Sequence, residues 1–228
     1  MKPWGIFVTG TDTGVGKTRV AAGLCRAYAA RGLRVAAMKP VATGSARTAA
    51  GLRNDDALAL HRAMNVRATY SEVNPYAFEP AIAPHIAAAE AGTTVDFDTL
   101  KRAYLRLGVR SDVTIVEGAG GWLAPIDAER GFADLAADWG LEVVLVVGLR
   151  LGCLNHALLS AESIERRGLR LLGWVANTID SQYERLQENI STLRTRLDAP
   201  CLAVLPFLPA DDDRAVARAL GERLILPP

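Results

Sequence analysis

Short runs of apolar residues alternate with amphipathic stretches along the whole chain. The apolar runs are nearly continuous in Ile, Val, Leu and Ala, as expected for strands of a parallel sheet that is covered on both faces. They predict strands at residues 4–9, 34–38, 112–117, 142–148, 171–177 and 201–205. The amphipathic stretches carry charge on one face and predict helices at residues 17–31, 55–64, 97–108, 131–139, 155–167, 182–197 and 212–223.

This alternation predicts one α/β domain over residues 1–228, with a doubly wound, mostly parallel sheet and helices on both faces, in three α/β/α layers. Residues 65–95 are the least regular part, because prolines interrupt any long helix there. This segment is expected to be a packed surface loop, with a binding loop as the alternative. Ligands of such folds bind at the carboxyl ends of the strands, so we expect the chemistry in the loops that follow them.

Composition and charge exclude several classes of protein. The chain has 228 residues, 50% of them hydrophobic and 22% charged, which is typical of a globular protein. With 26 basic against 25 acidic side chains the net charge is +1, so we expect neither a nucleic acid nor an anionic membrane as a partner. Mean hydropathy is +0.14, but every apolar run is interrupted well before the ~20 residues of a membrane span. The first residues lack a signal-peptide core, and a cytoplasmic location is expected.

The cysteines and histidines show no metal-site spacing. Cys25, Cys153 and Cys201 lie far apart in apolar surroundings, so we expect reduced thiols in the core and no disulfide. Cys153 has no neighbouring base in the sequence and is expected to pack and not to act as a nucleophile.

The strongest chemical signal is the segment GTDTGVGKT at residues 10–18, which lies directly between a predicted strand and a predicted helix. This is the context of a phosphate-binding P-loop, in which glycines let backbone N–H groups converge on phosphate oxygens. Lys17 adds a positive charge for the terminal phosphates, and the Thr18 hydroxyl is suited to ligate Mg²⁺. Five residues, instead of the usual four, separate Gly10 from Gly16.

A Mg²⁺ ion at a phosphate site also needs carboxylate ligands. Glu117 ends a predicted apolar strand and is followed by GAGG at residues 118–121, where small residues permit close approach of a substrate. Asp55 and Asp56 begin a predicted helix, where an ordinary N-cap is the alternative role. Glu117 is therefore the strongest carboxylate candidate.

Further blocks of sequence, together with the P-loop, resemble the dethiobiotin synthetase family. They lie in order along nearly the whole chain and are KPVATG at 39–44, GLRNDDAL at 51–58, NPY at 74–76, PH at 84–85, VEGAGGW at 116–122, VVG at 146–148, LGCLNH at 151–156 and GWVAN at 173–177. Many ATPases share a P-loop, whereas this combination of blocks is specific to the family.

The resemblance implies an ATP- and Mg²⁺-dependent cyclo-ligase of biotin biosynthesis. It would convert 7,8-diaminononanoate and CO₂ into dethiobiotin, with ADP and phosphate as the other products. One amine would capture CO₂ as a carbamate, the carbamate would take the γ-phosphoryl group, and the second amine would close the ring. The implied catalytic residues are Lys39 and Lys17, and the implied metal ligands are Thr18, Asp56 and Glu117. The neighbouring Asp55 leaves open which aspartate ligates the metal.

The resemblance also implies the residues that bind each substrate. Those for ATP are Gly14, Val15, Gly16, Lys17, Thr18, Arg19, Asp56, Glu117, Gly118, Ala119, Gly120, Asn177, Thr178, Pro206, Phe207, Leu208 and Asp213. Those for the diamine are Thr13, Thr43, Gly152, Cys153, Leu154 and Asn155. Residues 151–155 would hold the distant carboxylate of the substrate across a homodimer interface, since a helix amino terminus attracts anions. An ordinary N-cap at Asn155 is the alternative.

Two other classes of protein share a P-loop. A partition-type switch ATPase would carry an extra lysine early in its P-loop and a surface for DNA or membrane, and this sequence has neither. An amidoligase would need a glutamine-handling domain with a nucleophilic cysteine, for which 228 residues leave no room. The synthetase is therefore the preferred hypothesis and the switch ATPase the alternative.

Overall fold

The computed structural model describes residues 4–207 and 213–227. At its centre lies a six-stranded parallel sheet in the order β10-β9-β8-β1-β7-β2. Its strands are β1 Trp4–Gly10, β2 Val35–Met38, β7 Val113–Glu117, β8 Glu142–Leu149, β9 Leu171–Thr178 and β10 Cys201–Leu205. The predicted strands are confirmed to within one residue at either end.

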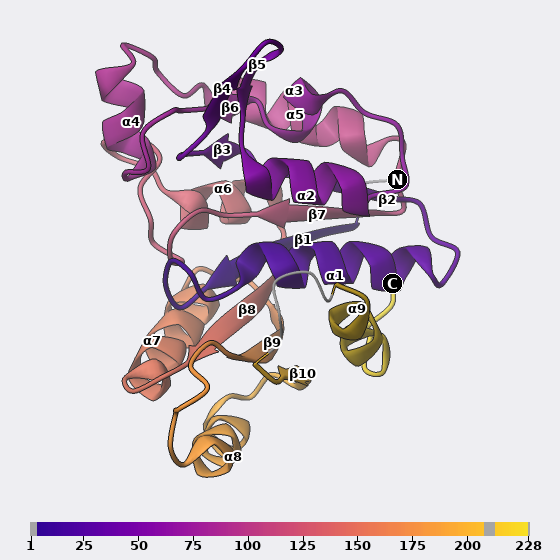
Figure 1. Cartoon of the computed structure of the whole chain (residues 1–228), viewed down its shortest axis with the longest axis vertical. Coiled ribbons are helices and arrows are strands. Elements are labelled where there is room, and N and C mark those ends of the chain that lie inside the picture. Colours follow the sequence, from indigo (N-terminus) through magenta and orange to yellow (C-terminus); the bar gives the residue numbers. More distant parts are fainter. Residues whose placement is uncertain (1–3, 208–212, 228) are drawn as a thin grey trace.

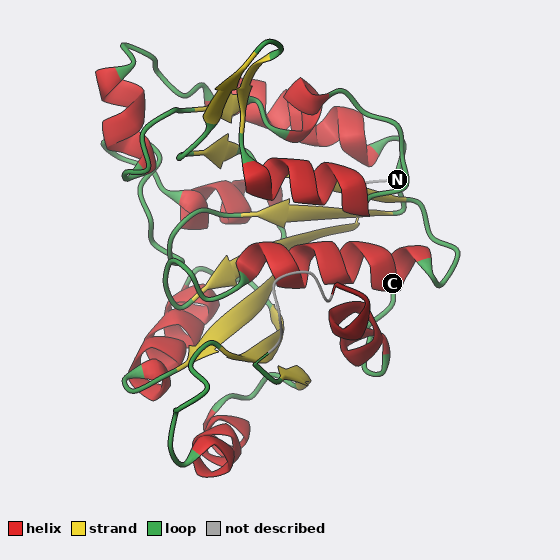
Figure 2. Cartoon of the chain, viewed as in Figure 1, coloured by secondary structure: helices red, strands yellow, loops and turns green. Residues whose placement is uncertain are grey.

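Helices cover both faces of this sheet (Figures 1 and 2). One face carries α1 Lys17–Ala29, α2 Asp55–Ala63 and α9 Asp213–Gly221. The other carries α5 Phe97–Gly108, α6 Phe132–Trp139, α7 Cys153–Arg166 and α8 Leu186–Arg196. The predicted doubly wound α/β fold is confirmed, although α8 begins only at Leu186 because the preceding Arg185 has a left-handed backbone (φ 57°).

Successive side chains of the central strands alternate between two apolar cores. Phe7 of β1 joins the core beneath α5 and α6, whereas its neighbours Ile6 and Val8 join the core beneath α1. Both sets are completely buried. Because a side chain on either face is removed from water, each strand is a continuous apolar run in the sequence.

Residues 39–95 contain short elements that the sequence did not predict. They are the strands β3 Val41–Ala42 and β6 Tyr76–Ala77, the hairpin β4 Ala46–Thr48 with β5 Gly51–Arg53, and the helices α3 Tyr70–Val73 and α4 Pro84–Glu90. The expectation of an irregular loop over 65–95 is corrected here. Pro84 starts a helix because it stands at the first helical position, where no N–H is needed.

The sheet register sets the position of the P-loop. Val8 of β1 pairs with Glu117 at the end of β7, and Gly10 pairs with Val146 of β8 on the other side. The loop after β1 therefore leaves the sheet between two strands that end beside it. Among the described helices, none combines the length and apolar content that crossing a membrane requires.

Candidate functional site

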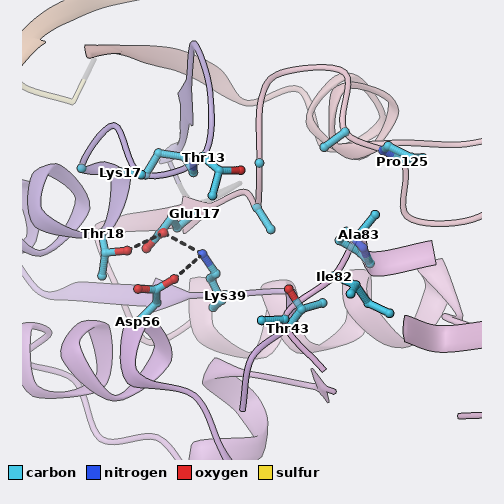
Figure 3. A pocket seen from close by; sticks show the side chains of 17 residues that line it. Thr13, Lys17, Thr18, Lys39, Thr43, Asp56, Ile82, Ala83, Glu117 and Pro125 are labelled. Carbon is cyan, nitrogen blue, oxygen red and sulfur yellow. Dashed lines mark hydrogen bonds and ion pairs between the residues drawn. The ribbon is translucent and has the colours of Figure 1, made fainter. Parts of the chain in front are cut away.

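The loop after β1 has the backbone of a phosphate cradle. Gly14 and Gly16 both adopt left-handed conformations, with φ of 76° and 93°, and α1 starts directly afterwards at Lys17. The Lys17 ammonium donates a hydrogen bond of 2.9 Å to the backbone oxygen of Asp12 and lies across the loop (Figure 3). The amino terminus of α1 and one ammonium group are thus directed at the same space.

Gly16 is fixed by a neighbour on β9. A Cβ atom at this position would lie 2.4 Å from Nδ2 of Asn177, which donates a hydrogen bond of 2.8 Å to the backbone oxygen of Val15. Asn177 is buried, and its Oδ1 has no hydrogen-bond partner among the described residues. The Asn177 side chain, which is predicted to bind ATP, therefore lies directly against the P-loop.

The extra residue of the P-loop is held by contacts to β8 and the turn after it. Thr11 donates its backbone N–H to the oxygen of Val146 at 3.0 Å. The Asp12 carboxylate accepts the backbone N–H of Thr13 at 2.7 Å and forms an ion pair with Arg150, directly before the turn at residues 151–152. The longer loop is therefore joined to the segment predicted to bind the substrate carboxylate.

Four side chains from four elements meet beside this loop (Figure 3). Glu117 at the end of β7 accepts the Thr18 hydroxyl at 2.8 Å and the Lys39 ammonium at 2.7 Å on the same oxygen, Oε1. The Lys39 ammonium also lies 3.1 Å from Oδ2 of Asp56 on α2 and donates to the backbone oxygen of Gly118 at 3.0 Å. Asp56 faces this cluster, whereas Asp55 at the start of the same helix is exposed.

The buried cluster shifts the acidity of its members. Burial by itself would lower the pKa of Lys39, but contact with Glu117 and Asp56 outweighs it, so the pKa is raised and the ammonium stays charged. Burial would likewise raise the pKa of Asp56, but Lys39 and the Thr18 hydroxyl lower it. Both groups are therefore charged at neutral pH.

Burial lowers the pKa of Lys17 to about 8, and the nearby charge of Lys39 adds to this effect. Glu117, Asp56 and Asp12 act in the opposite direction but do not restore the usual value. Lys17 is therefore mostly protonated at neutral pH and loses its proton as the pH rises through about 8.

This shift predicts a pH dependence of ATP binding. Above pH 8 the free protein carries a neutral Lys17 amine, so binding of the phosphates must also take up a proton. We expect the Kd of ATP to rise by up to about tenfold per pH unit above 8, measured by calorimetry between pH 7 and 9.5. A Lys17→Met variant should bind ATP more weakly at neutral pH and without this pH dependence. A wild-type Kd that stays constant to pH 9.5 would contradict the assignment.

The donor set fits a magnesium ion. Hard oxygen atoms from the Thr18 hydroxyl and two carboxylates converge here, and Mg²⁺ prefers such ligands together with phosphate oxygens and water. Oε2 of Glu117 is buried and has no hydrogen-bond partner in the described part of the chain, which leaves it available to a cation. Residues 4–207 and 213–227 hold no group of three or more His, Cys, Asp or Glu side chains suited to a metal, so the hydroxyl is needed to complete this site.

A cavity of about 750 Å³ opens in front of the cluster. Its polar wall contains Thr13 and Thr43 besides the charged residues, and Gly14, Gly16, Ala119 and Gly120 leave room for a ligand. The opposite wall is apolar and formed by Ala81, Ile82, Ala83 and Pro84, before and at the start of α4 (Figure 3). This apolar wall was not predicted, since its only signal in the sequence is a short apolar segment between Pro80 and Pro84.

Other predicted residues lie around or outside this cavity. Val15 and Thr178 are buried beside the P-loop and at the end of β9, and Arg19 lies half-buried in the first turn of α1. Pro206 and Phe207 are exposed after β10. Leu208 lies outside the described residues, and Asp213 begins α9.

The predicted carboxylate-binding segment is not among the residues that line the cavity. Helix α7 begins at Cys153 and is capped by Gly152, so the alternative of an N-cap at Asn155 is wrong. Gly152 and Asn155 are exposed, whereas Cys153 and the other two cysteines are buried free thiols, as predicted for core residues.

Comparison with known proteins places this chain in a family. Residues 4–214 match a family model described as an AAA domain. The chain is 55% identical over 95% of its length to the ATP-dependent dethiobiotin synthetase BioD of Pseudomonas paraeruginosa, of which it covers 96%. It is also 47% identical to the protein of that name from Xanthomonas oryzae pv. oryzae, over 98% of this chain and 99% of the relative. The chain belongs to the dethiobiotin synthetase family.

Structural comparison shows how widely the fold of this synthetase family is shared. A chain of the MinC:MinD cell division protein complex of Aquifex aeolicus superposes with a TM-score of 0.60 over 96% of this chain and 93% of its own length, at 17% sequence identity. That likeness concerns the fold alone. The α/β architecture is common to both, and residues from the segments 39–44, 51–58 and 116–122 line the cavity of this chain.

Proposed function

We propose that this protein converts 7,8-diaminononanoate, CO₂ and ATP into dethiobiotin, ADP and phosphate. The observation that carries the proposal is the pairing, in one cavity, of two lysines and two carboxylates beside a P-loop with an apolar wall opposite them. The charged side fits an anion that receives a phosphoryl group, and the apolar side fits an alkyl chain. Membership of the dethiobiotin synthetase family supports this assignment.

The reaction asks for positioning and charge stabilisation more than for covalent chemistry. An amine nitrogen of the diamine attacks CO₂ and loses a proton, which gives a carbamate anion. A carbamate oxygen attacks the γ-phosphorus of ATP, and the bond to the β-phosphate oxygen breaks to release ADP. The second amine then attacks the carbonyl carbon, loses a proton, and expels phosphate to close the cyclic urea.

Named side chains are suited to each requirement. Lys17 reaches the terminal phosphates from the first turn of α1, and Lys39 stands at the carboxyl end of β2, where it can stabilise the carbamate and the transferring phosphoryl group. The hydroxyls of Thr13 and Thr43 line the cavity and can orient the diamine. Thr18, Asp56 and Glu117 would hold Mg²⁺, which when bound neutralises charge on the phosphate oxygens.

A diamine-dependent assay tests the proposed function. Protein, MgATP and bicarbonate are mixed with or without 7,8-diaminononanoate, ADP release is followed, and dethiobiotin is identified by mass spectrometry. We expect turnover only with the diamine and equal amounts of ADP and dethiobiotin. ATP hydrolysis that is stimulated instead by DNA or lipid vesicles would support a switch ATPase and reject the synthetase.

We also propose that the functional unit is a homodimer joined through α7. Leu159 on this helix is 56% exposed, and Leu151 in the turn before it is 92% exposed. Leu123 is 60% exposed on a loop whose Trp122 donates to Ser163 of α7 at 3.2 Å. A partner covering these leucines would bring its own chain to residues 151–155. Absence of nucleic-acid or membrane partners and a cytoplasmic location stay predictions.

If α7 forms the dimer interface, an aspartate introduced on α7 should weaken dimerisation, whereas an aspartate at an exposed position elsewhere should not. Leu159→Asp should raise the dimer Kd at least about 100-fold, since it forces a charge into a desolvated interface. Val109→Asp is the matched control, because Val109 is 78% exposed at the end of α5. Sedimentation velocity over a range of concentrations measures both variants. A wild-type chain that stays monomeric with both substrates present would refute the dimer.

A further inference from the structure

The hydrogen bonds of Lys39 leave its ammonium without a free donor. The group has three N–H bonds and faces three acceptors, Oε1 of Glu117 at 2.7 Å, the oxygen of Gly118 at 3.0 Å and Oδ2 of Asp56 at 3.1 Å. The side chain is only 4% exposed, so water does not offer an alternative partner. Lys39 can therefore donate to a carbamate or phosphoryl oxygen only after it gives up at least one of these contacts.

Two of the acceptors that Lys39 contacts belong to the Asp56 and Glu117 carboxylates, which are expected to ligate a metal. Oε1 of Glu117 also accepts the hydroxyl of Thr18, and Oδ2 of Asp56 lies on the same side of the cluster (Figure 3). A metal ion and an ammonium group cannot both occupy the space between these oxygens. The Glu117 side chain is completely buried, so its charged carboxylate is costly without a cation beside it, whereas Asp56 is partly exposed.

From this geometry we infer that Lys39 is an exchangeable internal cation that holds the Asp56 and Glu117 carboxylates until a divalent metal replaces it. The exchange frees the ammonium toward the cavity, where it can reach the substrate. Before the metal binds, Lys39 would hold the two carboxylates in place. When a metal bound together with the nucleotide takes over these carboxylates, the Lys39 ammonium would be free to contact the substrate. The identity of the substrate that the freed ammonium contacts rests on the proposed function. The exchange between lysine and metal does not depend on it.

Competition between lysine and metal can be measured without turnover. Mn²⁺ binding to nucleotide-free protein is followed by electron paramagnetic resonance of the free ion. Lys39→Met removes the competing cation and keeps the volume of the side chain, so its Kd for Mn²⁺ should fall at least about tenfold below that of the wild type. Lys101→Met is the matched control, since Lys101 forms an exposed ion pair with Asp138 and does not line the cavity, and its Kd should change less than about threefold.

A second measurement uses the unmodified protein. The ¹⁵N-labelled lysine ammonium signals are recorded by NMR with ADP alone and with ADP and Mg²⁺. The Lys39 signal should lose its protection from proton exchange only when Mg²⁺ is added. An unchanged Lys39 signal, or equal Mn²⁺ affinities of Lys39→Met and the wild type, would overturn the exchange. Since neither measurement uses the diamine or bicarbonate, their outcome is independent of the diamine-dependent assay.

Discussion

Replacing Lys39 with methionine is expected to lower kcat about 10³-fold in saturating MgATP and diamine, whereas the Kd of ATP changes less than about threefold. The Lys39 side chain is buried, and under the proposed function its charge would stabilise the developing charge on a transferring phosphoryl group far better than water does. Its contribution would be made mainly in the transition state, because Lys17 and the P-loop would bind the ground-state phosphates. Steady-state kinetics and calorimetry measure the two quantities separately.

A second lysine variant controls for effects on kcat that come from removing any lysine side chain. Lys101 on α5 forms an exposed ion pair with Asp138 and does not line the cavity, so Lys101→Met should keep wild-type kcat. Thermal unfolding with and without Mg²⁺ shows whether Lys39→Met is folded under the assay conditions. A variant that loses ATP affinity as strongly as it loses kcat would assign Lys39 to ground-state binding and contradict the catalytic role.

Gly16→Ala is expected to weaken ATP binding at least about 100-fold, the second large effect. A left-handed backbone costs a residue with Cβ about 1–2 kcal/mol, and the added Cβ would stand 2.4 Å from Nδ2 of Asn177. Either Asn177 moves and breaks its bond to the oxygen of Val15, or the loop itself shifts. Both movements misplace the N–H groups that would face phosphate. Calorimetry with ATP measures the loss.

Gly14→Ala is the control that separates the effect of the Asn177 contact on ATP binding from the effect of backbone strain. Gly14 is also left-handed, with φ 76°, but nothing lies within 4 Å of the position of its Cβ. Its alanine variant should therefore carry only the strain and bind ATP about tenfold more weakly at most. Equal losses in the two variants would show that conformation alone, and not the contact with Asn177, decides the requirement for glycine at Gly16.

The sequence alone predicted the sheet because its strands are buried on both faces. Phe7, Ile6 and Val8 are apolar whichever core they face, so the run is visible without knowledge of the fold. Apart from helix α2, the short elements in residues 39–95 could not be found in this way. α3 and the strands β3 and β6 have only two to four residues, too few to show a period, and depend on neighbours that are distant in sequence.

The same distinction holds for the candidate site. The P-loop with Lys17 and Thr18 is a local motif whose chemistry follows from spacing, and the polar residue Glu117 stands out at the end of an apolar strand. The sequence left open whether Asp55 or Asp56 faces the site. That depends on how α2 rotates against α1 and β2, and the packing of Ala57 and Leu60 turns Asp56 inward.

The amino-acid sequence by itself determined the fold class, the phosphate loop and, through its resemblance to a family, the residues to examine. Only the tertiary structure decided that Lys39 has all three donors occupied, that Asn177 restricts Gly16, and that residues 81–84 form an apolar wall. Each of these facts joins segments between 37 and 161 residues apart, as in the pairs Lys39 with Glu117, Gly16 with Asn177, and Gly44 with Ala81. Local patterns report burial and turn chemistry, whereas such contacts arise only when the sheet brings the ends of its strands together.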